Sequence, residues 1–561
     1  MHEWIEILYS KLAFAAIGAF ITILTIDGRN QQRKRRVRSK AKRRIKELKW
    51  HIQGQLLPEV PKELQVKIAS STLSELREGL DKGDFTSEQI LLAYLKILAK
   101  DALIRNLISD VKVEEALKEA RTLDEELKQG HKRGILHGIP IVSKDNFSVK
   151  GMINTCGWVK HYKNIQNEDA LHVEALRSQG AIIYALAAVP QGLKSYELFN
   201  NFTKRGLHPQ YIDRTPGGSS GGVAALVSLG CSALGIGDDL VGSIRVPASF
   251  CGLAGFRATP KRISAVSPFG YTVGFPCLNV SFGAIGKVVD DCVVYMEAIC
   301  DKYMHQRDLS IPPLPWNEEK YRDQRKLKIG YIDSDEYWPL PACMARAVEV
   351  AKETLRKLGH EIVKIQPPSL EDVNFSIIAQ TMNSRRYSYW NEPECELFVD
   401  NLDNPLKASC SFGIKDKYSI YSDATSVTNS YEFVKHLKKT TQLRNDFLKK
   451  WADLEIDAII APYPVPAMIH GSNQKLELGF AYVTLFSILE CPVGNVPIGI
   501  ISEDEQSYPE TEESWTKVMN TNMQKSKGLP ICVQIAASPY QDELCLNVMS
   551  QLEANIREKL D

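Results

Sequence analysis

The chain has 561 residues, 44% of them hydrophobic and 24% charged, with a formal net charge of +1. Such a length and composition are ordinary for a globular enzyme with a large core, and they argue against a small disulfide-framework protein. The charge is segregated, because residues 29–49 hold twelve Lys or Arg and one acidic residue, leaving 57 basic and 67 acidic residues elsewhere. The body of the chain is therefore mildly acidic.

The cysteines favour a protein that faces the cytosol. None of the twelve is spaced C-x-x-C, and no Cys/His cluster has the spacing of zinc ligands. Several lie in apolar runs, as Cys532 and Cys545 do. We expect reduced, mostly buried thiols, no metal and no cofactor.

The N-terminal segment is predicted to anchor the chain in a membrane. Residues 8–26 form an apolar run of 19 residues whose one charge is Lys11, and the basic run 29–49 follows. About 20 apolar residues span a bilayer, and a basic flank stays cytoplasmic, so the body should lie in the cytosol, at an endomembrane. A cleavable signal peptide has the reverse order. Two alternatives remain: the apolar run could be a buried helix, and the basic run could be a nucleic-acid or nuclear-targeting patch.

Three units follow from this pattern: a transmembrane anchor over residues 1–28, a basic juxtamembrane segment and connector over 29–68, and one large domain over 69–561. Pro58 and Pro61 mark the connector. In the domain, residues 84–100 have helical apolar spacing, with Thr86 and Gln89 placed to form a capping box.

The rest of the domain alternates strands and helices, which predicts an α/β fold around a largely parallel or mixed sheet. Strands are expected at 138–142, 181–189, 328–332, 360–365, 456–460, 491–500 and 529–536, and helices at 222–229 and 342–358.

Two glycine-serine segments and one lysine carry the chemistry. Lys144 follows the strand 138–142, Ser219 lies in the GGSSGG run 217–222, and Ser243 lies 24 residues further on. GGSSGG alone is a weak signal and also fits the nucleophile elbow of α/β-hydrolases, but that elbow needs a strand before it, and here Pro216 precedes it. Two serines on glycine-rich turns and a lysine in an apolar stretch supply a nucleophile, a proton relay and a base.

In this order and spacing, Lys144, GGSSGG and the Gly-Ser-Ile-Arg run 242–245 resemble the amidase signature family over about residues 70–546. Within it the chain is most similar to the animal fatty-acid amide hydrolases, as the stretches IPPLP from 311, LKIGY from 327, GLP from 528 and QDELCL from 541 indicate. The resemblance implies an amidase-signature α/β fold, with a large twisted mixed β-sheet flanked by helices, here preceded by the N-terminal transmembrane helix.

The resemblance also implies roles. Ser243 attacks an amide carbonyl to form an acyl-enzyme, Ser219 passes the proton, and Lys144 is the base in its neutral form. A cis peptide joins Gly218 to Ser219. The backbone N–H groups of Leu240, Val241, Gly242 and Ser243 form the oxyanion hole, and Ser220 and Arg245 brace the loop. Leu193 and Lys194 line the substrate channel.

The chain departs from the family at three places. The usual pattern before the nucleophile, Ser/Thr-Asp-x-Gly-Gly-Ser, becomes DDLVGS here, so Val241 replaces a glycine and Asp238 adds a carboxylate. A β-branched residue is costly where φ is positive. Lys194 stands where the lipid amidases have an aromatic residue, and residues 400–440 are polar where those enzymes have an apolar cap.

We therefore expect a membrane-anchored serine hydrolase that cleaves fatty-acyl or other acyl amides, with a small-molecule substrate, no nucleic acid and a possible homodimer. Two alternatives remain. One is a catalytically impaired pseudo-amidase that binds a lipid or protein partner, as the changes at Val241 and Asp238 suggest. The other is the glutaminase-type subunit of an amidotransferase.

Overall fold

The computed structural model of the protein describes residue 32 and residues 35–49, 51–53, 57–267, 277–377 and 429–557. The predicted anchor over residues 1–28 lies outside these residues, as does most of the polar stretch 400–440. In the part that is described, no helix is long and apolar enough to cross a bilayer.

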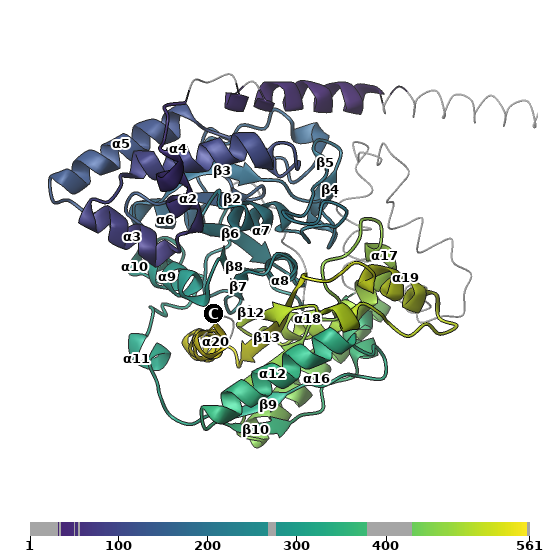
Figure 1. Cartoon of the computed structure of the whole chain (residues 1–561). Coiled ribbons are helices and arrows are strands. Elements are labelled where there is room, and N and C mark those ends of the chain that lie inside the picture. Colours follow the sequence, from purple (N-terminus) through teal and green to yellow (C-terminus); the bar gives the residue numbers. More distant parts are fainter. Residues whose placement is uncertain are drawn as a thin grey trace, which may run out of the picture.

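One long sheet runs through the molecule (Figure 1). Among the described residues it has eleven strands, in the order β1-β3-β2-β6-β8-β7-β12-β13-β11-β9-β10, and a separate two-stranded sheet joins β4 to β5. The strands are β1 (Ile108–Val111), β2 (Pro140–Lys144), β3 (Ile182–Ala187), β4 (Phe199–Asn200), β5 (Lys204–Arg205), β6 (Leu234–Asp239), β7 (Ala254–Arg257), β8 (Ser281–Gly286), β9 (Lys328–Tyr331), β10 (Glu361–Lys364), β11 (Ala458–Pro462), β12 (Val493–Ile500) and β13 (Pro530–Ala537).

The pairing is mixed, as predicted. β2 lies between β3 and β6 and is parallel to both, and β9 is parallel to β10 and β11. The pairs in between, from β6–β8 to β11–β13, are antiparallel, as is β1–β3. The central strands are buried on both faces, which explains their nearly continuous apolar sequences.

Helices cover both faces of the sheet. α7 and α8 pack together against strands from β3 to β13, whereas α9, α12 and α20 form a second contiguous group. The helices are α2 (Lys62–Ser70), α3 (Leu73–Lys82), α4 (Ser87–Ile97), α5 (Glu114–Lys128), α6 (Leu171–Ser178), α7 (Gly221–Ser228), α8 (Arg245–Phe250), α9 (Val289–Ile299), α10 (Lys302–Arg307), α11 (Glu318–Tyr321), α12 (Ala342–Lys357), α16 (Ser430–Asp453), α17 (Asn473–Leu476), α18 (Ala481–Ile488), α19 (Ser514–Met523) and α20 (Asp542–Arg557).

The predicted elements are found within a few residues of their expected ends. α4 begins with the expected capping box, in which Thr86 accepts from the Gln89 N–H and Gln89 accepts from the Thr86 N–H. In the large sheet, the sequence did not single out β1, β6, β7 and β8. β6 reads LGIGDD, and its two aspartates hide it from a search for apolar strands.

The predicted juxtamembrane segment and connector contains helices that the sequence analysis did not specify. Residues 35–49 are helical, and α2 occupies 62–70. The helix over 35–49 turns Val37, Ala41, Arg44 and Leu48 inward, and these residues are spaced by three or four. Arg44 Nη2 contacts Asp110 Oδ1 at 2.5 Å and donates to Ser109 O at 3.0 Å, so this segment packs on the domain.

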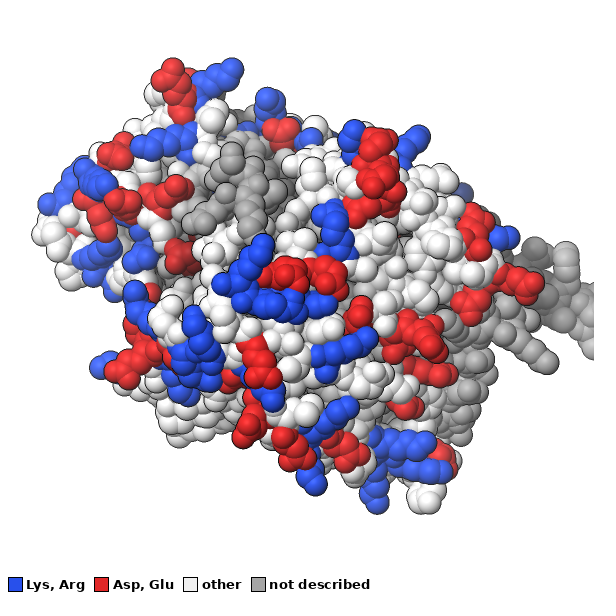
Figure 2. Space-filling view, turned by 60° about the horizontal axis from the view of Figure 1, so that its bottom comes forward, with Lys and Arg blue, Asp and Glu red and all other residues white. Residues whose placement is uncertain are grey.

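The surface carries charges of both signs. On the face shown in Figure 2, Lys and Arg side chains are interspersed with Asp and Glu, and neither sign gathers into one continuous patch. In the sequence, the segment around residues 35–49 carries much of the basic excess.

Candidate active site

Lys144 ends β2 in the interior of the domain. β2 is a parallel strand between β3 and β6, with Ser143 opposite Ile236 on β6, so its last side chain meets the end of β6. The Lys144 side chain has no exposed surface. A buried ammonium needs acceptors for its three N–H groups.

Three acceptors surround the Lys144 amine. Its Nζ donates to Ser219 Oγ at 2.7 Å and to the Asp238 backbone oxygen at 3.1 Å, and it also contacts Asp238 Oδ1. The sequence placed Asp238 near the oxyanion loop, but its carboxylate lies on the lysine. The second carboxylate oxygen, Oδ2, accepts from Asn146 Nδ2 at 2.9 Å.

Ser219, the predicted relay residue, lies on the loop that precedes α7. A cis peptide joins Gly218 to Ser219, as the resemblance implied. The loop needs its glycines: Gly217 has φ +89°, and a Cβ on Gly218 would lie 2.2 Å from Ser195 O. Ser219 is 2% exposed, and Ser220 Oγ is buried without a hydrogen-bond partner.

Ser243 lies beside this loop, just before α8. The Ser220 N–H donates to Ser243 O at 3.0 Å, which holds the two glycine-serine segments together. Ser243 is 8% exposed, more than Ser219 or Lys144. No hydrogen bond joins the side chains of these two described serines, and such catalytic contacts often form only when substrate binds. The three predicted residues are thus brought to one site, with the Lys144–Ser219 contact already made.

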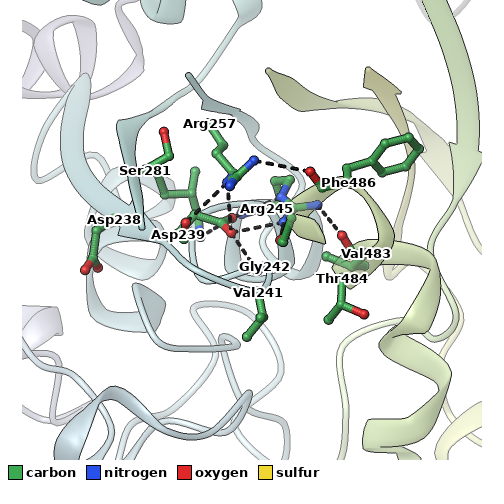
Figure 3. Close-up of polar contacts among 12 residues, drawn as sticks. Asp238, Asp239, Val241, Gly242, Arg245, Arg257, Ser281, Val483, Thr484 and Phe486 are labelled. Atoms are coloured by element: carbon green, nitrogen blue, oxygen red, sulfur yellow. Dashed lines mark hydrogen bonds and ion pairs between the residues drawn. The ribbon is translucent and has the colours of Figure 1, made fainter. Parts of the chain in front are cut away.

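Asp239 fixes the loop from the other face of β6, since neighbouring strand residues point to opposite sides. Figure 3 shows Asp239 turned toward Arg245 and Arg257, away from Asp238. Arg245 Nε and Nη2 donate to the two Asp239 oxygens at 3.0 Å each. The N–H groups of Gly242 and Ile244 donate to the same carboxylate at 2.6 and 3.0 Å. Burial opposes ionisation, yet these contacts hold the pKa of Asp239 below its usual range.

The predicted oxyanion loop differs from expectation at Gly242, because its N–H is already bonded to Asp239. For Leu240, Val241 and Ser243, the structure gives no N–H hydrogen bond that would block such a role. Gly242 has φ +116°, and a Cβ there would lie 2.8 Å from Val483 Cγ1. Val241 does not have a positive φ, so its β-branched side chain is accommodated. Its carbonyl accepts from Tyr196 Oη at 2.6 Å.

Leu193 and Lys194 belong to a half-buried turn next to this site. Leu193 has φ +62°, and its N–H donates to Pro190 O at 2.9 Å. The Gly192 N–H donates to Cys156 O at 2.8 Å, which ties the turn to the loop that follows β2. The Cys156 N–H in turn donates to Asp145 O at 3.1 Å, so backbone hydrogen bonds connect the turn to the residue after Lys144.

Sequence reasoning missed Asn146, Tyr196 and Arg257. Asn146 lies two residues after Lys144, and Arg257 Nε donates to Asp239 O at 3.2 Å. The pair Asp238-Asp239 was the available signal, because two adjacent carboxylates at the end of a buried strand require partners on both faces.

Two more titratable groups lie near Lys144. Burial raises the pKa of the Asp145 carboxyl to about 7, against hydrogen bonds from Thr155 that lower it. Burial also raises the pKa of the Cys156 thiol well above its usual value. Among the described residues, no group of three His, Cys, Asp or Glu side chains could hold a metal ion.

Comparison with known families gives one clear match. The model of the family described as Amidase matches residues 89–546 of this chain. Fatty-acid amide hydrolase 1 of Sus scrofa is 27% identical over 500 residues, covering 86% of this chain and 85% of the relative. The vitamin D3 hydroxylase-associated protein of Gallus gallus is 36% identical over 308 residues, covering 54% of this chain and 65% of that protein.

The solved structures agree on the fold. A structure of fatty acid amide hydrolase superposes with a TM-score of 0.78 at 23% identity, covering 92% of this chain and 95% of the other. A peptide amidase from Stenotrophomonas maltophilia has a TM-score of 0.64 at 19% identity, covering 87% of this chain and 97% of the other.

Proposed function

This chain belongs to the Amidase family, as an amidase-signature hydrolase related to the fatty-acid amide hydrolases, and from that premise we propose that it cleaves acyl amides through a covalent intermediate on Ser243. The single observation that carries the proposal is the 2.7 Å contact between Lys144 Nζ and Ser219 Oγ, on a loop bonded to the segment of Ser243. It supports a proton path from Ser243 through Ser219 to Lys144.

In the first half of the reaction, the Oγ–carbon bond forms as the Ser243 proton moves to Ser219 and the Ser219 proton moves to neutral Lys144. The carbonyl oxygen becomes an oxyanion beside residues 240–243, where backbone N–H groups stabilise it. The carbon–nitrogen bond then breaks, and the leaving amine takes a proton back along the same path. In the second half, water attacks the acyl ester, and the acid and Ser243 are released.

The substrate class is proposed to be an acyl amide with an apolar acyl chain. The kinship with the fatty-acid amide hydrolases supports a long chain, whereas Lys194 on the turn beside the site disfavours one unless its ammonium reaches water. A series of acyl 4-nitroanilides from acetyl to oleoyl separates the two cases.

The test compares hydrolysis of this series by the parent chain, Ser243→Ala and Lys144→Ala. Both variants should lose roughly 10³-fold or more of kcat/KM. Ser228→Ala, a half-buried serine at the end of α7, is the matched control and should stay near the parent rate. Equal rates in Ser243→Ala and the parent would refute the assignment. Ammonia release from glutamine that depends on a partner subunit would favour the amidotransferase alternative.

We also propose that residues 1–28 anchor the domain at a membrane on its cytosolic side. The helix over 35–49 supports this, because its inner face packs on the domain while Arg36, Lys42 and Lys46 are exposed beside the anchor, where anionic headgroups would lie. The full chain should resist alkaline carbonate extraction from microsomes. A chain without residues 1–28 should be released, and extraction of both would contradict the anchor.

A further inference from the structure

The position of Asp238 brings its carboxylate to the Lys144 amine. It stands where the family pattern has serine or threonine, and its carboxylate contacts Lys144 Nζ inside the domain. The Lys144 and Asp238 side chains are 0% and 3% exposed, so water competes little for either charge. Since serine and threonine hydroxyls carry no charge, this chain has a buried ion pair where the family pattern has a neutral side chain.

Lys144 has as many acceptors around it as an ammonium ion has N–H groups. Its three N–H groups match three acceptors: Ser219 Oγ, the Asp238 carbonyl and Asp238 Oδ1. A neutral amine has two N–H groups and one lone pair, and as a base it must accept from the Ser219 hydroxyl. With Lys144 charged, the 2.7 Å bond to Ser219 runs the other way, from lysine to serine.

The environment of Asp238 favours the ionised carboxylate. Its Oδ2 accepts from Asn146 Nδ2 at 2.9 Å, so both oxygens face donors. A protonated carboxyl would need an acceptor for its own hydrogen. A carboxylate in contact with an ammonium favours the charged form of both partners.

We propose that Asp238 holds Lys144 as an ammonium ion in the resting site, so that the Ser243–Ser219–Lys144 relay operates only after this ion pair has lost one proton. The inference rests on the proposed function. It makes Asp238 a positioning residue that sets the pH at which the enzyme works. Once the proton is lost, the carboxylate also stabilises the ammonium that reforms when Ser243 attacks.

Other charged groups near the pair do not produce the same effect. Asp239 lies on the opposite face of β6 and is bound to Arg245 and Arg257. The Cys156 thiol stays neutral because burial raises its pKa well above the usual value. Asp145 titrates near neutrality, with its pKa raised to about 7 by burial, but its carboxylate faces Thr155. From β8, the neighbouring residues Ser281 and Phe282 do not titrate.

The test follows the rate at which a fluorophosphonate labels Ser243, from about pH 5 to about pH 10, in the parent chain, Asp238→Thr and Asp238→Asn, with Ser243→Ala as background. In this reaction the Oγ–phosphorus bond forms, fluoride leaves and the serine proton enters the relay. The parent rate should rise toward alkaline pH. Both variants should move that rise about one to three pH units lower and label about tenfold or more faster at neutral pH.

Two results would overturn the inference. One is a parent rate that does not change between about pH 6 and about pH 8. The other is a rate that falls by the same factor at every pH in variants whose thermal unfolding shows a folded domain, which would mean a merely structural role. Labelling of the parent at Ser243 with either result leaves the proposed function intact. Absence of labelling in all three chains at every pH contradicts both proposals.

Discussion

Three neighbouring carboxylates in the interior differ in the cations they meet. Asp239 contacts two guanidinium groups and several backbone N–H groups, Asp238 contacts one ammonium, and Asp145 accepts only from neutral donors such as the Thr155 N–H at 2.8 Å. The three carboxylates are all buried, so it is their different partners that give them different roles. Asp239, with its full set of fixed donors, holds the loop, whereas Asp238 contacts the amine that we propose as the base.

The largest expected effect comes from Asp239. Asp239→Ala leaves Arg245 and Arg257 buried without their counter-ion, so the free energy of unfolding should fall by about 3–5 kcal/mol. Urea unfolding measures the change, with exposed Asp504→Ala as the control. A loss below about 1 kcal/mol would show that the network does not brace the site.

A second prediction compares two adjacent arginines on the helix over 35–49. Arg44→Met removes the buried partner of Asp110, and we expect the amides of this helix to lose protection from hydrogen exchange, by an amount equivalent to about 3 kcal/mol. Arg43→Met removes an exposed contact with Glu47 and should leave protection unchanged. Equal effects from the two variants would mean that the Arg44 pair does not hold the helix on the domain.

The third prediction concerns the carboxylate without a cation. Burial raises the pKa of Asp145 in the folded state to about 7, above its usual value of 3.8. The folded chain therefore binds one more proton than the unfolded chain between these values, and stability falls as pH rises through them, by at most about 1.4 kcal/mol per pH unit. Chemical unfolding of the parent and Asp145→Asn at several pH values should show a difference that shrinks or reverses toward neutral pH. Parallel stability curves would contradict it.

The smallest effect is expected at Val241. Because its φ is not positive, replacing it with glycine relieves no strain, and Val241→Gly should change the labelling rate of Ser243 by less than about threefold while costing roughly 0.4–1 kcal/mol of stability. Labelling kinetics and thermal unfolding check this. A large gain in labelling would instead mean that the valine damages the oxyanion loop.

Much of the sheet could be predicted from sequence because apolar runs mark its buried strands. β2, β3 and β9 to β13 were found in this way. β6 was not, since Asp238 and Asp239 at its end disguise a buried strand whose charges are paired with Lys144, Arg245 and Arg257.

The candidate site was likewise predicted in part. Lys144, Ser219 and Ser243 were recognised by order and spacing, and the structure brings them together. The sequence did not predict the ion pair between Lys144 and Asp238, nor the hydrogen bond from the Gly242 N–H to Asp239. Both depend on which way each residue of the strand points. A pattern of residue types does not contain that information until the register of β6 beside β2 is known.

The proposed reaction depends most on Ser243 as the nucleophile. Peptide mapping by mass spectrometry, after exposure of the full chain to a fluorophosphonate at alkaline pH, tests it directly. One adduct on the peptide that contains Ser243, absent from Lys144→Ala, is the predicted result. An adduct on any other serine, or equal labelling of Ser243 when Lys144 is replaced, would contradict it.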